Sequence, residues 1–303
     1  MMHTVKKYLS LVKFSHTIFA MPFAFIGFFL GVMHSSAGFS DADQTIQHHY
    51  FSWQYLVQKF LLVIICMVTA RNSAMAFNRY LDRHFDARNP RTAIREIPKG
   101  IISPESALRF VILNCLLFLA ATYFINKICF YLAPVALFVI LFYSYTKRFT
   151  ALCHLVLGIG LSLAPIGAYL AVTGQFNLLP LLFSFAVIFW VSGFDVIYAL
   201  QDIDFDQSQK LYSIPATVGK TNALNISSFL HFLSAACVIY AGLYGYFHIL
   251  YWLGIGVFVG MLLYQHSIVK PNDLSRVNIA FMTANGIASV VFSLFVIADL
   301  FIF

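Results

Sequence analysis

The sequence predicts an all-α integral membrane protein, with nine transmembrane helices in one bundle around a central cavity. Of the 303 residues, 60% are hydrophobic and only 10% are charged, whereas soluble domains have about 25% charged residues. Basic residues also gather in alternate loops between the apolar stretches. Those stretches, each about as long as the 20 residues that a bilayer requires, lie at 15–34, 54–77, 107–126, 128–146, 152–173, 178–200, 222–246, 248–268 and 279–302.

The first stretch follows a basic N-terminal region that begins Met-Met-His-Thr-Val-Lys-Lys. It has the length of a full span and no clear small-residue cleavage site, so we expect an uncleaved helix. The third and fourth stretches are separated by Lys127 alone, which makes their boundary the weakest of the set. Together the stretches predict a single domain over residues 1–303.

The basic residues predict the orientation, because cytoplasmic loops are rich in Lys and Arg. One set of alternate loops holds nearly all of them: Lys6, Lys7, Lys13, Arg79, Arg83, Arg88, Arg91, Arg95, Lys99, Arg109, Lys147, Arg148, Lys210, Lys220, Lys270 and Arg276. The opposite loops have almost none. This pattern predicts a cytoplasmic N-terminus, an outer C-terminus and a location in the cell inner membrane.

Asn78, Asp82 and Asp86 are spaced four residues apart at the cytoplasmic end of the second stretch. On a helix each step of four turns the side chain by only roughly 40°, so the three share one stripe. Carboxylates beside a bilayer are costly unless a positive charge accompanies them. The stripe therefore indicates a binding site for a cation.

A second acidic cluster, formed by Asp195, Asp202 and Asp206, closes the sixth stretch at the same membrane face. Six of the chain's 12 acidic residues lie in the two clusters: Asp82, Asp86, Asp195, Asp202, Asp204 and Asp206. Such concentration indicates one shared site, either a set of mutual ion pairs or a site for a metal-bound polyanion. Mg²⁺ commonly binds one or two carboxylates together with substrate phosphates. On a helix Asp204 points away from Asp202 and Asp206, so we leave it out of the metal set.

These segments resemble the signatures of the UbiA superfamily of membrane prenyltransferases. The resemblance rests on Asn78-x-x-x-Asp82-x-x-x-Asp86, Pro90-Arg-Thr-Ala-x-Arg95-x-x-Pro98-x-Gly100, Tyr143-Ser-Tyr-Thr-Lys147-Arg148-x-Thr150, Asp195-Val-Ile-Tyr198-Ala-Leu-Gln-Asp202-Ile-Asp-Phe-Asp206 and Ser213-Ile-Pro-Ala-Thr-Val-Gly219. It covers nearly the whole chain and is closest to 4-hydroxybenzoate polyprenyltransferases and related quinone-pathway enzymes. Arg79 is a departure, because many members have Asp directly after the Asn.

The resemblance implies Mg²⁺-dependent transfer of a polyprenyl group from a polyprenyl diphosphate to a ring carbon of an aromatic acid. It implies catalytic roles for Asp82, Asp86, Asp202, Asp206 and Tyr198, and Mg²⁺ ligands at Asp82, Asp86, Asp202 and Asp206, assisted by Asn78 and Asp195. The diphosphate would be bound by Lys147 and Arg148, with Arg91, Arg95 and Lys99 as further candidates. Tyr198 would face the allylic cation. The expected partners are the two substrates and the lipid bilayer, without nucleic acid.

Arg71 lies inside the second stretch, two turns before Asn78 and near the same stripe. An ionisable residue within a membrane span is a functional candidate. Arg71 would bind the carboxylate of an aromatic acid, or it is satisfied by helix carbonyls and neighbouring amides. The sequence leaves both interpretations open.

Several alternatives remain at this stage. The acceptor is a 4-hydroxybenzoate, as in ubiquinone biosynthesis, or a dihydroxynaphthoate, as in menaquinone biosynthesis. A haem or chlorophyll-type prenyltransferase and a cation transporter are less favoured, the transporter because the acids cluster at one face and not deep in the spans. The loop 87–106 is a lid over the diphosphate or an ordinary surface loop.

Overall fold

The computed structural model describes residues 2–12, 21–36 and 52–303. In chain order its helices are α1 (Met2–Leu11), α2 (Met21–Ser36), α3 (Trp53–Leu81), α4 (Arg83–Arg88), α5 (Pro104–Ile125), α6 (Lys127–Thr146), α7 (Cys153–Thr173), α8 (Leu178–Ala199), the 3₁₀ turn η2 (Leu200–Asp202), α9 (Ile203–Ser208), α10 (Ile214–Tyr244), α11 (Ile249–Ile268), the π-helix η3 (Ile279–Ala284) and α12 (Asn285–Ile302). The predicted all-α class is confirmed.

Eight helices in the described ranges are long and apolar enough to cross a membrane, and α2 adds a shorter apolar helix of 16 residues. These nine correspond in order to the nine predicted stretches. Only residues 21–34 of the first stretch are tested, because residues 13–20 lie outside the described residues. Nine apolar helices are therefore consistent with the prediction, with α2 as the short member.

The boundary between α5 and α6 lies at Asn126, one residue before Lys127. Asn126 has extended backbone angles (φ −167°, ψ 170°), and its side-chain oxygen accepts a 2.9 Å hydrogen bond from the Cys129 N–H. Its amide nitrogen donates to the Leu170 carbonyl at 2.8 Å. A side-chain cap of this kind contributes about 1 kcal/mol. One residue thus ends α5, starts α6 and ties both to α7.

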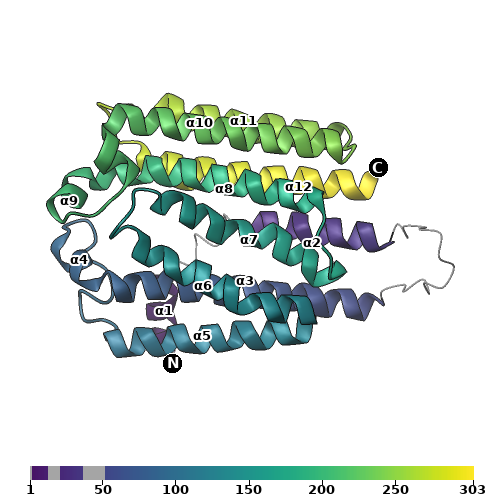
Figure 1. Ribbon diagram of the computed structural model, residues 1–303, viewed down its shortest axis with the longest axis horizontal. Helices are drawn as coiled ribbons and strands as arrows, with labels where there is room; N and C mark the ends of the chain where they lie inside the picture. Colours follow the sequence, from purple (N-terminus) through teal and green to yellow (C-terminus); the bar gives the residue numbers. More distant parts are fainter. Residues whose placement is uncertain (1, 13–20, 37–51) are drawn as a thin grey trace.

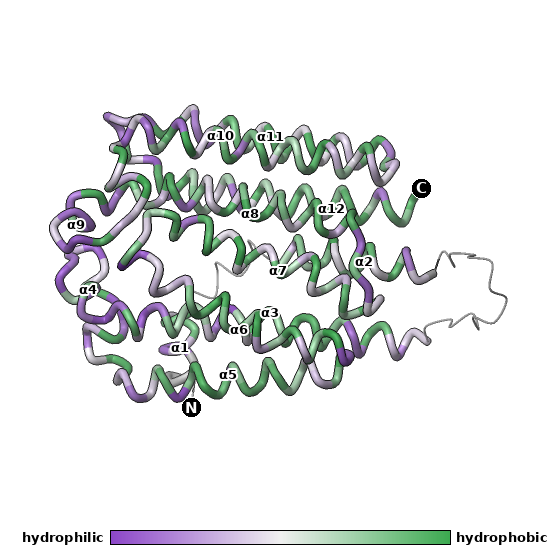
Figure 2. Tube along the Cα trace, viewed as in Figure 1, coloured by the Kyte–Doolittle hydropathy of each residue, from purple (hydrophilic) through white to green (hydrophobic). Residues whose placement is uncertain are grey.

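The long helices lie side by side (Figure 1). α8 packs against α7 and α10, α2 against α7 and α12, and α3 against α5 and α6. The short helices α4 and α9, more than 100 residues apart in the chain, lie next to each other at one end of the bundle (Figure 1). Hydrophilic residues gather at that end, whereas the long helices are mostly hydrophobic (Figure 2). In the part of the chain that the structure describes, hydrophilic residues thus mark this end of the bundle, called the polar pole below, and both acidic clusters lie there.

Trp190 of α8 belongs to the largest core cluster of the described residues and is fully buried. Its indole N–H donates to the Asn285 side-chain oxygen at 2.9 Å, and Gln265 donates to the same oxygen at 2.8 Å. These bonds satisfy buried polar groups of α8, α11 and α12, as a membrane interior requires. Large apolar side chains such as Leu116 and Phe138 are exposed on the outer faces, which suits contact with lipid.

Candidate active site

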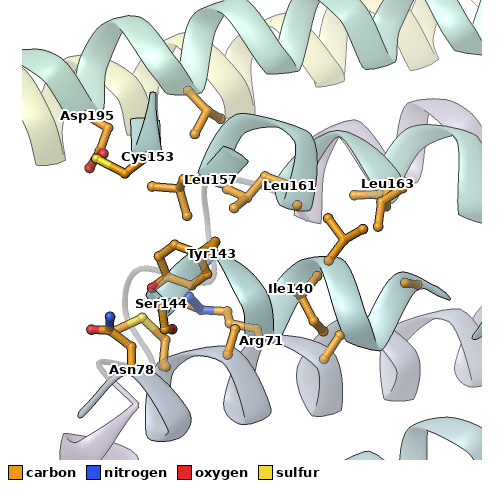
Figure 3. Close-up of a pocket in the computed structure, with 18 of the residues that line it drawn as sticks. Arg71, Asn78, Ile140, Tyr143, Ser144, Cys153, Leu157, Leu161, Leu163 and Asp195 are labelled. Atoms are coloured by element: carbon orange, nitrogen blue, oxygen red, sulfur yellow. The ribbon is translucent and has the colours of Figure 1, made fainter. Parts of the chain in front are cut away.

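A cavity of about 690 Å³ lies between α3, α6, α7 and α8, and it contains both acidic clusters. Its polar end is lined by all but one of the predicted site residues, namely Arg71, Asn78, Asp82, Asp86, Arg91, Arg95, Lys147, Arg148, Asp195, Tyr198, Asp202 and Asp206. The rest of the wall is mainly apolar, including Ile140, Leu157, Leu161 and Leu163 (Figure 3). Lys99 is exposed and does not line the cavity. The cavity thus consists of a charged part, called the head region below, and an apolar part.

The first cluster keeps its helical spacing although α3 ends at Leu81, between Asn78 and Asp82. The Asp82 N–H donates to the Asn78 carbonyl at 2.9 Å, and the Asp86 N–H donates to the Asp82 carbonyl at 2.8 Å. The four-residue bonds thus continue from α3 into α4. The Asn78 amide also donates to Asp82 Oδ2 at 3.1 Å. The three side chains follow one stripe that faces the cavity.

The second cluster spans a change of helix type. Asp195 lies in α8, Asp202 ends the 3₁₀ turn η2, and Asp206 lies in α9. Asp206 accepts a 2.9 Å hydrogen bond from the Ser213 hydroxyl, and the same hydroxyl caps α10 at the Ala216 N–H. Asp206 is thereby fixed between α9 and the start of α10.

Each carboxylate of the first cluster forms an ion pair. Arg148 lies 2.8 Å from Asp82 Oδ1. Arg95 contacts both oxygens of Asp86, at 2.7 and 2.9 Å. The cations come from different segments, since Arg148 follows α6 whereas Arg95 lies in the loop after α4.

Asp202 and Asp206 of the second cluster are paired in the same way. Lys147 Nζ lies 2.7 Å from Asp206 Oδ1. The Arg91 guanidinium holds both oxygens of Asp202, with Nε at 3.0 Å from Oδ1. The Asn89 amide also donates to Asp202, at 3.2 Å.

These pairs join the two clusters. Arg91 follows the first cluster in the chain but binds the second, and the neighbours Lys147 and Arg148 divide between them. Four cations that could bind phosphate are thus held by four carboxylates that could bind metal. A ligand that brings both Mg²⁺ and negative charge could bind each set without leaving a buried charge unpaired.

Burial differs among the four carboxylates. The side chains of Asp82 and Asp202 are 24% and 12% exposed, whereas those of Asp86 and Asp206 are 8% and 0% exposed. Burial raises the pKa of Asp82 to about 6, although the Arg148 guanidinium acts in the opposite direction. Asp82 is therefore easier to protonate than an ordinary carboxylate, and it is the most open of the four.

Asp195 has a different partner from the other acids. Its Oδ2 lies 2.6 Å from His154 Nδ1, and His154 Nε2 accepts a hydrogen bond from the Ile214 N–H at 3.3 Å. His154 is almost completely buried and lines the cavity. The sequence motifs assign His154 no role in the site. Its place just after Lys147 and Arg148 was the one available signal that it belonged to the site.

Tyr198 lies one turn before Asp202 and lines the cavity. Its hydroxyl accepts a 3.0 Å hydrogen bond from Arg91, whose guanidinium carbon also lies 5.2 Å from the ring centre. Phe281 supports the ring, with the two centroids 4.3 Å apart. The ring is held beside the head region of the cavity.

Arg71 reaches into the cavity from α3, near Tyr143 and Ser144 of α6 (Figure 3). It lies further along α3 from the acidic pole than Asn78 does. Tyr143 and Ser144 belonged to a segment with family resemblance, but the sequence assigned them no role. Together these residues form the border between the charged and the apolar parts of the cavity.

The carboxylate oxygens of the cavity are the kind of donor that Mg²⁺ prefers. Among the described residues, no three His, Cys, Asp or Glu side chains come together as a preformed metal cluster. Mg²⁺ does not require one, because it usually takes one or two carboxylates and completes its shell with water and phosphate. Two pairs of carboxylates around one cavity fit that requirement.

The fold and cavity define a class: a polytopic membrane protein with a cavity that is charged at one end and apolar along the rest of its wall. The comparison with protein families is specific. Residues 24–287 match the UbiA prenyltransferase family, and the chain belongs to that family. It is a membrane prenyltransferase.

Known relatives agree with this assignment. A 4-hydroxybenzoate octaprenyltransferase of Paraburkholderia phytofirmans is 30% identical over 77% of this chain and 81% of its own length. One of Nitrosospira multiformis is 27% identical over 77% of this chain and 80% of its own. The apo structure of a UbiA homologue from Aeropyrum pernix K1 superposes with a TM-score of 0.76 at 26% identity, covering 95% of this chain and 97% of that one.

A UbiA homologue from Archaeoglobus fulgidus, bound to DMAPP and Mg²⁺, has the same fold. Its TM-score is 0.70 at 19% identity, over 98% of this chain and all of that one.

Proposed function

We propose that this protein transfers a polyprenyl group from polyprenyl diphosphate to a ring carbon of an aromatic acid, of the 4-hydroxybenzoate type, in a Mg²⁺-dependent reaction of ubiquinone biosynthesis. The observation that carries the proposal is the two-part cavity, with paired acids and bases at one end and an apolar wall beyond. Residues 1–303 would form a single prenyltransferase domain. The names of the relatives favour this acceptor.

The charged end would bind the diphosphate. Asp82, Asp86, Asp202 and Asp206 would hold Mg²⁺, with Asn78 and Asp195 assisting, and the bound metal would neutralise charge on the leaving diphosphate. Arg91, Arg95, Lys147 and Arg148 would exchange their carboxylate partners for phosphate oxygens. Each carboxylate released in this way becomes available to the metal, so head-group binding preserves the charge balance of the pole.

Tyr198 would stabilise the allylic carbon as its bond to oxygen breaks. Arg91 now lies against the Tyr198 ring. When Arg91 turns to phosphate, that ring face is available to the substrate cation, at roughly 0.5–2 kcal/mol for such a contact. The apolar remainder of the cavity excludes water, which would otherwise trap the cation.

Arg71 would pair with the acceptor carboxylate at the border of the two regions. An aromatic acid held there has its ring between the charged pole and the apolar wall. A dihydroxynaphthoate also carries a carboxylate, so it is the second candidate acceptor. The positive-inside pattern supports a location in the inner membrane with this pole on the cytoplasmic side.

A prenyl-transfer assay in membranes tests the proposal. The protein is supplied with a polyprenyl diphosphate and either 4-hydroxybenzoate or a dihydroxynaphthoate, with and without Mg²⁺. The expected result is a Mg²⁺-dependent, ring-prenylated 4-hydroxybenzoate. Product from the naphthoate alone would move the enzyme to menaquinone biosynthesis, and diphosphate binding without either product would exclude a small aromatic acid.

A further inference from the structure

The loop that carries Arg91 and Arg95 is fixed by a buried ion pair outside the proposed binding residues. Arg79 lies 2.6 Å from Glu96 Oε2, and the two residues are only 3% and 8% exposed. The Ser10 hydroxyl of α1 donates to the other Glu96 oxygen. The Glu96 carbonyl accepts hydrogen bonds from Ile101 and Ile102, at 2.9 and 3.2 Å. Glu96 thus connects α1, α3 and the loop.

The two halves of this loop have different surroundings. Ile97 and Ile102 are buried in a cluster with Leu11 of α1 and Ala76 of α3. The half before Glu96 has Arg91 and Arg95 on the acidic clusters, and its Ile94 is 67% exposed. The first half is held by charges that a diphosphate would exchange and by hydrogen bonds such as that from the Thr92 hydroxyl to the Asp86 carbonyl at 3.1 Å. The second half belongs to the protein core.

Arg79 is a cation where a carboxylate would have been expected after Asn78, and it lines the cavity. A buried ion pair is weak evidence for stability, because desolvation offsets its attraction. A buried ion pair can instead hold a loop in one conformation. With Glu96 held, the adjacent Arg95 can reach Asp86 without ordering the loop anew.

We propose that the Arg79–Glu96 pair is a positioning device: it anchors the loop so that Arg91 and Arg95 stay at the diphosphate end, and it confines movement on substrate entry to residues 89–95. Of the lid that the sequence allows over residues 87–106, only the segment 89–95 then moves, and the anchored Glu96 marks its fixed end. Prepositioned cations lower the entropy cost of binding the head group. The inference rests on the proposed function for the identity of the ligand, the diphosphate. The anchoring of the loop by Arg79 and Glu96 does not depend on that function.

Trypsin cleavage after Arg91 and Arg95, followed by mass spectrometry, tests the anchor without any substrate. Glu96→Gln and Arg79→Met should each speed cleavage about tenfold, because the loop opens locally more often. Arg83→Met and Glu105→Gln are matched controls, since both residues lie at the same pole but outside the cavity. Both controls should cleave at the wild-type rate.

The double variant Arg79→Met/Glu96→Met separates positioning from folding, because it leaves no unpaired buried charge. It should unfold at a temperature close to that of the wild type, yet keep the fast cleavage. In the transfer assay its KM for the diphosphate should rise about tenfold while the acceptor KM stays within about twofold, as for lost preorganisation.

Wild-type cleavage rates in the double variant would overturn the anchor. Fast cleavage with an unchanged diphosphate KM would overturn the link to the head group. If even the wild type transfers no prenyl group, the cleavage comparison still decides the anchor, while the proposed function fails separately.

Discussion

The two acidic clusters look alike in sequence but differ in how their charges are arranged. In each, the first carboxylate of the four-residue pair is the more open one: Asp82 against Asp86, and Asp202 against Asp206. The first cluster takes one cation from its own loop, Arg95. The second takes both of its cations from elsewhere in the chain.

This difference indicates a division of labour. The open carboxylates, Asp82 and Asp202, are placed to exchange their cations for metal. The closed ones, Asp86 and Asp206, would bind metal as well, and before the ligand binds they hold the cation-bearing segments in position. Identical spacing therefore does not imply identical roles, and variants at the two kinds of position should fail in different ways.

The largest effect is expected at the open carboxylates. Asp82→Asn and Asp202→Asn should each lower prenyl transfer about 10³-fold, because several kcal/mol of charge stabilisation on the leaving group depends on them. Their unfolding temperatures should stay near the wild-type value. Initial rates over a Mg²⁺ series and thermal unfolding in detergent provide the measurements.

Asp204→Asn is the matched control, since Asp204 lies between the two carboxylates of its cluster but is exposed. It should keep wild-type activity. An equal loss in this variant would show that net charge at the pole matters more than the individual ligands.

Asp206→Asn should lower stability in addition to weakening metal binding. Asp206 is fully buried, and its loss leaves Lys147 without its carboxylate. Breaking a buried pair costs 3–5 kcal/mol, and partial exposure of Lys147 should reduce the cost to about 2–3 kcal/mol of unfolding free energy. Adding Lys147→Met should recover part of the loss in chemical unfolding. A stable but inactive Asp206→Asn would place Asp206 with the open carboxylates instead.

Much of this pole follows from local periodicity. Asn78, Asp82 and Asp86 needed only a continuous pattern of four-residue hydrogen bonds to share a stripe, and the bonds through Asp82 supply it although α3 ends at Leu81. The nine apolar stretches likewise required nothing beyond length and hydropathy. The position of Arg71 in the cavity could also be predicted from the sequence, because a charged residue within a membrane span usually has a functional role.

Which residues pair with one another could not be predicted from the sequence in the same way. Glu96 lies in an irregular loop, so no helical period connects it with Arg79. His154 and Asp195 come from adjacent helices whose relative rotation depends on packing along their whole length. The division into open and closed carboxylates depends on η2 and on Ser213, which tertiary contacts position.

Arg148→Met should separate head-group binding from stability. Arg148 pairs with the open Asp82, so it is among the cations expected to move to phosphate. Loss of one charge-assisted contact should raise the diphosphate KM about tenfold or more. Steady-state kinetics with both substrates varied measures this, and Arg276→Met, an exposed arginine that does not line the cavity, serves as control. An increase in the acceptor KM alone would reassign Arg148 to the acceptor.

Arg71→Met should do the reverse at the far border of the pole. The acceptor KM should rise about tenfold because one carboxylate contact is lost, while the diphosphate KM stays unchanged. Arg71→Lys should recover part of the effect by restoring the charge without the planar fork. A variant with normal acceptor kinetics would show that Arg71 is satisfied within the helix bundle and does not bind substrate.

The smallest effect, and the sharpest test of the open carboxylate, is the pH dependence. Because burial raises the pKa of Asp82 to about 6, lowering the pH from 7.5 to 5.5 should weaken Mg²⁺-dependent diphosphate binding several-fold as the carboxylate is protonated. The stability contribution has the opposite sign. The folded pKa exceeds the unfolded value, so protonation of Asp82 stabilises the fold as the pH falls from about 6 toward 4. Isothermal titration and thermal unfolding across this range should therefore change in opposite directions, and Asp82→Asn should reduce both changes. Parallel changes would mean that acid weakens binding by loosening the fold and that Asp82 is not the open ligand.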